Sequence, residues 1–567
     1  MCDQVAPSTT PFMKSLLFYS LLLFSFFHPI SSKGQTIDPT KLNSTLAALI
    51  KPGDPGFSVA IVQNSKVKYA KAFGMSDIIL KKKNTVGTPF NIASMSKQFT
   101  AACIYLLERE GKLATSDKLS KYFPDLPSYA DSITITDLIH HQNGLRDYIT
   151  LFWLRDMTED SAYGPSSTYQ ILAKQKSLNF SPGTSFSYTN TGYYFLSEIV
   201  RKVSGQDLQA YARQNIFNPL KMKHTSFSRT HAVKNKANGY YHNGEQFIAH
   251  NQLDSTIGQG NAYSVVADWQ YWFQEMKNHK VLGEQIWRKM TSPASTIDGK
   301  QTGYGGGLLI HDFHGRSTID HGGDLSAYHS KMTYFPKEDL GIVVFSNNSE
   351  IEGSTLTESI YNQLFKTRDA LTTAMNVSSA EDIIQNITLD TNRYTGFYRV
   401  NDSEAFTLEV KVADHKLSVN QLWNASKYAI VPDNDSLFHI DGNKDIRFEF
   451  INIRDGKSGE VVIHQNNQHT AAKRIMIVPA TSTSMEAYPG KFYNPEIDAV
   501  YEVMNDKGIL KLKIAKSELR LSSTGQKDKY NIPENGMQIT FTRSSDDFID
   551  GLKLNHVRVK DLHFSKQ

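Results

Sequence analysis

Four short segments in the last third of the chain recur at a nearly constant offset, and this internal repeat constrains the fold more than any other feature. The runs around them combine strand-forming residues with Asn, Asp and Gly turns, a pattern typical of β-structure. An offset shared by four pairs indicates two copies of one module, whereas one larger β domain would need four coincidences. We therefore predict two all-β modules, residues 388–478 and 484–567, joined by a Ser- and Thr-containing stretch. The paired positions are Tyr394 with Tyr488, Asp414 with Asp506, Ile446 with Ile539, and Gly459 with Gly551, at offsets of 94, 92, 93 and 92 residues.

The first 34 residues have the pattern of a targeting segment. Lys14 precedes an uncharged apolar run over 15–27, and small or polar residues lead from it to Gly34. The run is shorter than the roughly 20 apolar residues that a transmembrane helix needs. A cleaved secretory signal at 1–34 therefore fits better than an uncleaved anchor. No other stretch is apolar enough to span a bilayer, so we predict an exported, soluble protein, periplasmic or secreted.

Composition excludes several classes of function. The 567 residues include 61 Lys and Arg against 57 Asp and Glu, a formal net charge of +4. Without a basic excess there is no electrostatic case for a nucleic-acid partner. The cysteines are Cys2 and Cys103 alone, which excludes a disulfide scaffold and a Cys-rich zinc site. We predict neither a cofactor nor a metal.

Strand-like and helix-like patterns alternate between residues 35 and 370. With strands at both ends, this alternation predicts an α/β or α+β domain with one main sheet. One helix places Phe99 and Leu106 on the same stripe and stops at Gly111, a residue suited to a helix C-terminus. Residues 371–387 are expected to link this domain to the first β module. The expected strands are 57–62, 67–73 and 341–345, and the expected helices are 95–110 and 355–365.

The first chemical motif is Ser94-Met95-Ser96-Lys97, at the start of a predicted helix. A serine hydroxyl is a weak nucleophile until a base removes its proton. A lysine three residues later lies on the same helical face and can be that base if burial keeps it neutral. The helix N-terminus also directs backbone N–H groups at a developing oxyanion. The alternative is a helix cap and an exposed lysine, because Ser65 and Lys68 have the same spacing at a predicted hairpin turn.

The second motif is Tyr188-Thr189-Asn190. Residues two apart in an extended segment point the same way, so the phenol and the amide can face one cleft. The tyrosine can relay a proton, and the asparagine can hold a substrate amide or Lys97 by hydrogen bonds. The alternative is a turn followed by an aromatic core strand that continues through Tyr193 and Tyr194.

The third motif is His321-Gly322-Gly323-Asp324, which follows a strand-like run over 316–320. Paired glycines let a ligand approach the edge of a strand closely. His321 can contact a substrate or tune a proton relay. The alternative is a structural histidine beside a glycine turn.

In this order, and in helix, loop and strand contexts, the three motifs resemble those of the penicillin-recognising serine hydrolases. This superfamily includes β-lactamases, DD-peptidases, D-aminopeptidases and related esterases. The resemblance covers residues 36–365, with supporting matches at 133–145, 258–264 and 341–347. It implies a β-lactamase/transpeptidase-like catalytic domain with a mainly antiparallel sheet flanked by helices. It also places His140-His141 in a structural helix and turn, where no metal-ligand spacing such as HExxH supports zinc.

The resemblance further implies a two-step mechanism through an acyl-enzyme, with proton transfers that include activation of the water of the second step. It assigns Ser94 as nucleophile; Lys97 and Tyr188 as proton-transfer groups; Asn190, His321, Gly322 and Gly323 as substrate-binding residues; and the backbone N–H groups of Ser94 and Asp324 as the oxyanion hole.

His321 departs from the commonest pattern of this superfamily. β-Lactamases and most DD-peptidases carry a lysine there, within Lys-Thr-Gly, and its fixed charge attracts a substrate carboxylate. A histidine is largely neutral near pH 7. The Glu-x-x-Leu-Asn segment of class A deacylation is also absent. Both departures disfavour efficient β-lactam hydrolysis and favour aminopeptidase, amidase or esterase activity.

The two β modules favour the same choice. A catalytic domain followed by two small β modules resembles the D-aminopeptidases, whose modules are eight-stranded, lipocalin-like barrels. We therefore predict a serine hydrolase of D-aminopeptidase or D-amino-acid amidase type, with a small-molecule or short-peptide substrate. The alternatives are a β-lactamase or DD-carboxypeptidase, a carboxylesterase, and a non-catalytic penicillin-binding protein. The sequence does not identify the natural substrate or the role of the modules. It also leaves open whether the chain forms a homo-oligomer.

Overall fold

The computed structural model describes residues 37–567 with internal gaps. The residues left out are 157–162, 251–253, 326, 374–389, 401–405, 414–415, 423–425, 466–467, 477–484, 525 and 533–534. The predicted signal segment at 1–34 lies outside the described residues, as do most of the predicted linker at 371–387 and the join between the two β modules.

The part of the chain that carries the three motifs is built on one six-stranded sheet in which every pair of neighbours is antiparallel. This confirms the predicted mainly antiparallel sheet. In spatial order its strands are β10 (Leu309–Phe313), β11 (Arg316–Leu325), β12 (Tyr328–Phe335), β13 (Leu340–Ser346), β1 (Phe57–Gln63) and β2 (Lys66–Phe73).

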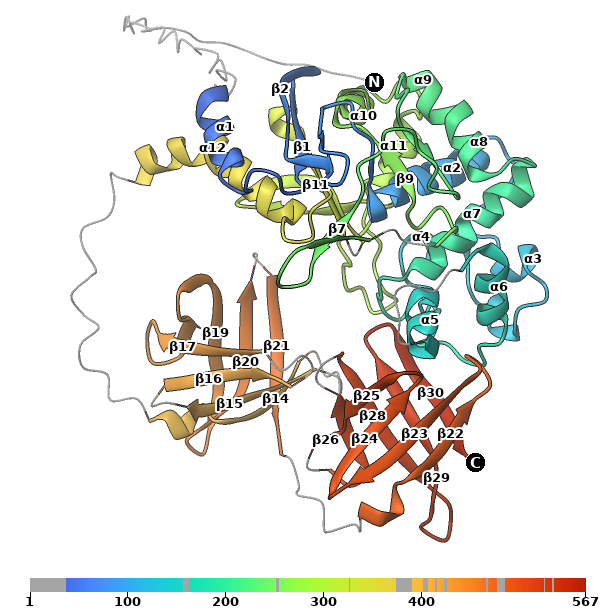
Figure 1. Ribbon diagram of the computed structural model, residues 1–567, viewed down its shortest axis with the longest axis vertical. Helices are drawn as coiled ribbons and strands as arrows, with labels where there is room; N and C mark the ends of the chain where they lie inside the picture. The colour runs from blue at the N-terminus through green and yellow to red at the C-terminus, as the bar shows by residue number, and fades with distance from the viewer. Residues whose placement is uncertain are drawn as a thin grey trace, which may run out of the picture. The chain divides into compact units, whose positions relative to one another are not determined.

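Both faces of the sheet are covered, as the buried strand β1 shows. Phe57, Val59 and Ile61 pack into a core with α1 (Pro39–Ala47) and α12 (Gly353–Thr373) on one face. The alternate residues Ala60 and Val62 pack into the core of the opposite face. Because side chains alternate along a strand, this double burial requires an apolar residue at nearly every position. Figure 1 shows α1 and α12 side by side at the sheet.

The helices of the second face include those that carry the motifs. α2 (Lys97–Arg109) follows the 3₁₀ turn η1 (Ala93–Ser96), and Gly111 just beyond it has φ +70°. The helix expected at 95–110 therefore begins two residues late, and the expected 355–365 helix is the longer α12. The other helices near the site are α4 (Ile135–Ile139), α5 (Tyr148–Asp156), α7 (Asn190–Ser204) and α10 (Trp269–Asn278).

The first β module is a closed eight-stranded barrel, because its first strand pairs with its last. Its core is a separate cluster that includes Tyr398, Phe438 and Phe450. The strands are β14 (Gly396–Val400), β15 (Thr407–Ala413), β16 (Lys416–Gln421), β17 (Lys427–Pro432), β18 (Leu437–Ile440), β19 (Asn443–Arg454), β20 (Lys457–Gln465) and β21 (Gln468–Ile475).

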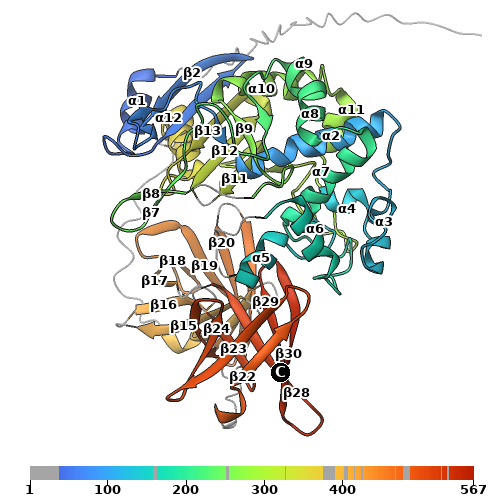
Figure 2. The ribbon, with the colours of Figure 1, turned by 45° about the vertical axis from the view of Figure 1, so that its right-hand side comes forward.

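The second β module is a nearly closed barrel, whose strands curl around one another in Figure 2. Its first and last strands pair, and the gap falls between β25 and β26, which flank Leu521. This interruption gives nine strands where eight are expected from the resemblance. They are β22 (Gly490–Asn494), β23 (Ala499–Asp506), β24 (Ile509–Ile514), β25 (Ser517–Arg520), β26 (Ser522–Ser523), β27 (Lys529–Ile532), β28 (Met537–Arg543), β29 (Ile549–His556) and β30 (Val559–Lys566).

The repeat between the modules extends to side-chain packing. Gly396 has φ +147° and Gly490 has φ +152°, a backbone region that only glycine adopts readily. In each module a basic side chain covers the glycine and lies over an aromatic ring two residues further on. Arg474 lies 4.8 Å from the ring of Tyr398, and Lys566 lies 5.7 Å from the ring of Phe492. The two modules therefore share one internal arrangement.

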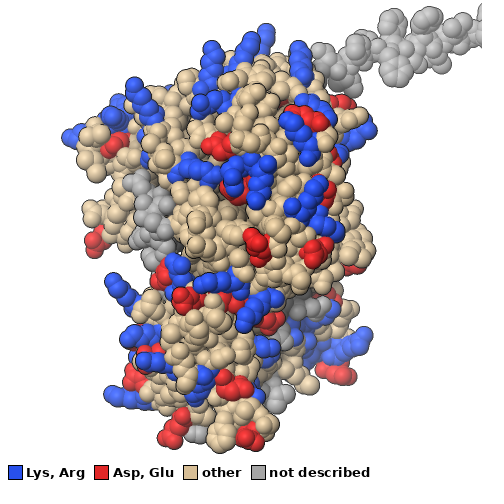
Figure 3. Space-filling view, turned by 90° about the vertical axis from the view of Figure 1, so that its right-hand side faces the viewer, with Lys and Arg blue, Asp and Glu red and all other residues tan. Residues whose placement is uncertain are grey.

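Two surface features bear on the predicted partners. Among the described residues, no helix is both long and apolar enough to cross a bilayer. On the face drawn in Figure 3, Lys and Arg side chains are interspersed with Asp and Glu.

Candidate active site

The Ser94 side chain is presented by a strained turn. Ala93, the residue before it, has φ +45°, a left-handed conformation that costs a non-glycine residue about 1 kcal/mol or more. The Asn91 side chain holds this turn by accepting the Ala93 N–H at 2.9 Å. The Ser330 hydroxyl supports it from β12 by donating to the Ile92 carbonyl at 2.8 Å. The surrounding structure thus fixes a backbone shape that leaves Ser94 half-exposed.

Lys97 meets the Ser94 hydroxyl in a buried environment. Its Nζ lies 3.0 Å from Ser94 Oγ, 2.9 Å from Asn190 Oδ1 and 2.7 Å from the Gln259 carbonyl oxygen. The side chain is fully buried. Three acceptors thus surround a nitrogen that has no carboxylate in direct contact within the described part of the chain.

These surroundings favour the neutral amine. Burial lowers the pKa of Lys97 well below its usual value, and the positive charge of Arg558 lowers it further, while Asp147 opposes both. A neutral amine has a lone pair, so it can accept a hydrogen bond from the Ser94 hydroxyl. The Ser94–Lys97 pair therefore has the contacts and the electrostatics of a nucleophile and its base.

Tyr188 and Asn190 reach the same site from a different backbone shape than expected. Thr189 is extended, but Asn190 is already the first residue of α7, so the motif is a helix start and not one extended segment. The Asn190 amide oxygen accepts from Lys97, and Lys97 Nζ lies 4.9 Å from the centre of the Tyr188 ring. Tyr193 and Tyr194 are buried in α7, where the alternative interpretation had a strand.

The Tyr188 hydroxyl has no hydrogen bond of good geometry among the described residues. Burial raises the pKa of this phenol above its usual range, and the nearby Ser94 hydroxyl and Arg558 partly counteract the rise. The hydroxyl is therefore neutral at ordinary pH and has a free proton to donate.

His321 is buried and neutral. Burial, with the charge of Lys97, lowers the pKa of its ring to about 4. Its Nδ1 pairs with the Gly322 carbonyl, which can only accept, so Nδ1 holds the proton and Nε2 accepts from the Tyr304 hydroxyl at 3.1 Å. His321 therefore supplies no positive charge at pH 7.

The paired glycines bring β11 against the nucleophile turn. β10 pairs with β11 only as far as Asp320, so the part of β11 that carries the motif pairs with β12 alone. A Cβ on Gly323 would lie 2.4 Å from the Ile92 carbonyl oxygen and 2.9 Å from the Ser94 amide nitrogen. Only glycine allows this approach.

These groups open onto one cavity of about 370 Å³. Ser94, Tyr188, Asn190, His321, Gly322 and Asp324 all line it. Lys97 lies beneath them, and Gly323 packs behind Ser94. The structure thus brings together all eight residues that the motifs single out.

Comparison with known proteins shows the family. A family model described as Beta-lactamase matches residues 42–362, more than half of the chain. The chain belongs to the beta-lactamase family.

Relatives within this family include D-aminopeptidases. The D-aminopeptidase of Brucella ovis is 28% identical over 300 residues, which are 52% of this chain and 56% of that enzyme. The D-aminopeptidase of Brucella anthropi is 23% identical over 463 residues, 80% of this chain and 82% of that enzyme. The chain thus spans little more than half the length of the first of these relatives. The predicted resemblance to D-aminopeptidases is confirmed.

Solved structures support the fold. The octameric penicillin-binding protein homologue from Pyrococcus abyssi has a TM-score of 0.53 and 23% identity, and the match covers 77% of this chain and 100% of that one. At this identity the likeness shows the fold alone. It confirms the predicted fold class of the beta-lactamase-family chain.

Sequence reasoning missed Asp147, which organises the beta-lactamase-family site from beneath. Its carboxylate accepts the N–H of Thr150 at 3.1 Å in α5 and the N–H of Asn190 at 2.6 Å in α7. One side chain thus caps two helices and fixes where Asn190 meets Lys97. An Asp three residues before a polar helix position is a usable cap signal.

It also missed Arg558, which comes from the second β module. Arg558 lies between β29 and β30, lines the cavity, and has its Cζ 5.4 Å from the centre of the Tyr188 ring. No motif marks this position, because it belongs to a hairpin turn in a module without catalytic residues of its own.

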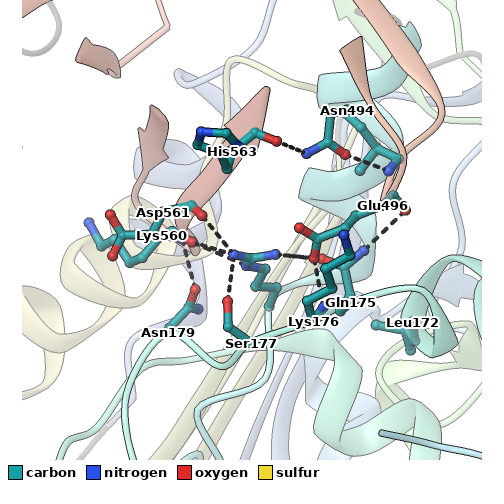
Figure 4. A network of polar contacts seen from close by, with 12 residues as sticks. Leu172, Gln175, Lys176, Ser177, Asn179, Asn494, Glu496, Lys560, Asp561 and His563 are labelled. Carbon is teal, nitrogen blue, oxygen red and sulfur yellow. Dashed lines mark hydrogen bonds and ion pairs between the residues drawn. The ribbon is translucent and has the colours of Figure 1, made fainter. Parts of the chain in front are cut away.

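A buried network attaches this module to the beta-lactamase-family domain (Figure 4). The Arg146 guanidinium pairs with Glu496 at 2.8 Å, donates to Gln175 Oε1 and Ser177 Oγ at 3.0 Å, and donates to the Lys560 carbonyl at 2.8 Å. The side chain of Arg146 is fully buried and that of Glu496 is 7% exposed. The module is therefore fixed against the wall of the site by charged, desolvated contacts.

Among the described residues, no three His, Cys, Asp or Glu side chains are grouped to hold a metal ion. His141, which adjoins Tyr188 at 4.3 Å between ring centres, is buried in a turn with φ +57°. Burial lowers the pKa of His141 well below its usual value.

Proposed function

We propose that this chain is an exported serine hydrolase that cleaves small amide, peptide or ester substrates through an acyl-enzyme. Peptides and amides of D-residues are the leading substrate class. The contact between Ser94 Oγ and the buried Lys97 Nζ, 3.0 Å apart at the floor of a cavity, carries the proposal. Its relatives named D-aminopeptidase support the substrate class.

In the first step Ser94 Oγ attacks the acyl carbon and its proton passes to the neutral Lys97 amine. The carbonyl π electrons move to oxygen, where the backbone N–H groups of Ser94 and Asp324 would stabilise the oxyanion. As the oxyanion collapses, the bond to the leaving group breaks. The leaving amine or alkoxide takes a proton from Tyr188, which Lys97 restores, and Ser94 remains acylated.

In the second step a water molecule attacks the acyl carbon. The Lys97 and Tyr188 pair accepts its proton, and the Ser94–acyl bond breaks to release the acid and regenerate the hydroxyl. Asn190, held by Lys97 and Asp147, would orient the substrate. Each proton lost by a nucleophile is thus returned to a leaving group.

At its position in the third motif, the neutral His321 cannot attract a β-lactam carboxylate as a lysine would. Its ring nitrogens are engaged by Gly322 and Tyr304, so it offers no fixed charge to a β-lactam carboxylate. Nitrocefin turnover tests the β-lactamase alternative directly.

Covalent labelling tests the mechanism. We expect intact mass spectrometry to show one adduct after treatment with a fluorescent phosphonate, and none in Ser94→Ala. A panel of D-aminoacyl amides, p-nitrophenyl esters and peptidoglycan peptides should then show turnover that Ser94→Ala lacks. An unlabelled wild type that hydrolyses no member of the panel would leave a non-catalytic binding protein as the better account.

Gly323→Ala is expected to lower kcat/KM for a p-nitrophenyl ester by about 100-fold. The added methyl would displace β11 or the Ser94 turn, and displacements near 1 Å have effects of that size. Gly87→Ala is the matched control, because its added carbon meets nothing closer than 3.8 Å. Equal activity of the two variants would contradict the tight packing of β11 against Ser94.

The pH profile of kcat/KM for a neutral ester is expected to fall on the acidic side as Lys97 takes up a proton. Burial and Arg558 lower the pKa of Lys97, so this limb lies well below the usual lysine range. Arg558→Gln removes one of the lowering charges, which raises the pKa and moves the limb to higher pH. Lys553→Gln removes an exposed charge from β29 and serves as control. A limb that moves to lower pH in Arg558→Gln would be inconsistent with Lys97 as the base.

Export and assembly are separate parts of the proposal. Cleavage after the apolar run would give a mature protein whose N-terminus lies near residue 35, as mass spectrometry of the secreted or periplasmic protein can show. The Pyrococcus abyssi homologue is octameric. Light scattering on the mature protein tests whether this chain also self-associates.

A further inference from the structure

We propose that Arg558 binds a carboxylate of the substrate, so that this enzyme prefers acyl substrates with an anionic group close to the scissile bond. The inference rests on the proposed function, and names the charged group that the site selects. It assigns the second β module a direct part in specificity.

Arg558 lies at the wall of the cavity that holds the motif residues. It follows β29 at the tip of the β29–β30 hairpin, and it lines the same cavity as Ser94. Its guanidinium lies over the Tyr188 ring, 5.4 Å from the ring centre. A group held there would be adjacent to the phenol that serves the leaving group.

The backbone at Arg558 is held rigidly by the catalytic domain. The Arg558 carbonyl oxygen accepts from the Asp147 N–H at 3.2 Å and from Asn179 Nδ2 at 3.0 Å. Asn179 Oδ1 accepts the N–H of Lys560 at 2.8 Å. The backbone that carries the guanidinium is therefore fixed against the wall of the cavity.

No acidic group neutralises this charge in the described part of the chain. Its guanidinium makes no ion pair there, and the nearby carboxylates have other partners. Asp147 accepts from Asn190 and Thr150. Asp324 pairs with His329 at 2.8 Å. Asp254 accepts from the Thr256 N–H at 2.7 Å and Gln259 Nε2 at 3.1 Å.

Burial works against a charge on the other basic groups of the site. Burial lowers the pKa of Lys97 well below its usual value and lowers that of His321 to about 4. An arginine stays protonated under all ordinary conditions. Among the described residues that line the cavity, Arg558 is the side chain that remains cationic at pH 7. The charge absent from His321 is thus supplied from a different module.

A guanidinium recognises a carboxylate through two parallel N–H···O bonds. The cavity therefore fits short peptides that have a free carboxylate better than their amides. The carboxylate can belong to the leaving group or to the acyl group, and the two sources call for separate substrate pairs.

Two matched pairs of substrates test the proposal on the full chain. N-acetyl-D-alanyl-D-alanine and its C-terminal amide differ by a carboxylate on the leaving group. N-succinyl- and N-acetyl-D-alanine p-nitroanilide differ by a carboxylate on the acyl side. We expect the kcat/KM of wild type to be about 10- to 100-fold higher for the anionic member of one of these two pairs, and that pair identifies the source of the carboxylate. Arg558→Gln should bring this ratio close to one, Arg558→Glu should invert it, and Arg558→Lys should keep part of it.

Two further measurements make the result decisive. Lys553→Gln removes an exposed charge from the same hairpin, and its ratios should match wild type. Calorimetric binding of N-acetyl-D-alanine to Ser94→Ala tests the carboxylate contact without catalysis. We expect its affinity to fall by about 10-fold in Ser94→Ala/Arg558→Gln. Unchanged ratios and unchanged binding in the Arg558 variants would overturn the inference and leave the hydrolase standing. Absent labelling of Ser94 together with Arg558-dependent binding would instead overturn the hydrolase alone.

Discussion

Lys97→Met is expected to lower kcat/KM for a p-nitrophenyl ester by about 10⁴-fold, and Ser94→Ala by a comparable factor. Lys97 is the basic group in direct contact with Ser94 Oγ, at 3.0 Å, and burial keeps it in the form that can accept a proton. Without it the hydroxyl has no base, and without the hydroxyl the base has no nucleophile to activate. The double variant should therefore lose no more than either single variant.

Lys68→Met is the matched control for this experiment. Ser65 and Lys68 have the same spacing as Ser94 and Lys97, but Ser65 lies in a hairpin turn with φ +61° and Lys68 is exposed on β2. Its activity should stay within a factor of two of wild type. If Lys97→Met loses less than about 10-fold, the base is another group, and the Tyr188 phenol is the first to examine.

Motif residues could be predicted because their spacing is set by local geometry. Ser94 and Lys97 are separated by nearly one helical turn, and Tyr188 and Asn190 flank one helix start. Gly323 is identifiable because only glycine fits where a strand meets the nucleophile turn. These local rules do not reveal the strained conformation of Ala93, which depends on Asn91 and on Ser330 from β12.

The rest of the site and of the fold could not be predicted, because it depends on contacts between residues far apart in the sequence. Arg558 enters the cavity because Asp147 and Asn179 hold a hairpin turn that comes several hundred residues later in the chain. Neither partner is part of a recognisable motif with it. The same limit applies to the fold. The repeat predicted two β modules. Only the pairing of the strands in the structure shows that the first module is a closed barrel and that the barrel of the second is interrupted at Leu521.

The attachment of the second module leads to the other large expected effect, which is on stability. Arg146→Met is expected to lower the free energy of unfolding by about 3–5 kcal/mol, because it leaves Glu496 as an uncompensated buried charge. It also removes the donors to the carbonyls of Lys560 and Asp561, which follow Arg558 in the hairpin. Urea unfolding followed by far-ultraviolet circular dichroism measures the loss.

A second substitution separates the charge from the loss of packing. Glu496→Gln in the Arg146→Met background keeps an oxygen for the Lys176 N–H, which Glu496 accepts at 2.7 Å, and removes the unpaired charge. Much of the stability should therefore return. Arg201→Ala is the control, because Arg201 is 52% exposed in its ion pair with Glu198 and should cost under about 1 kcal/mol. If Arg146→Met costs no more than Arg201→Ala, the buried pair does not hold the module. The placement of Arg558 would then rest on Asp147 and Asn179, which bind its backbone carbonyl directly.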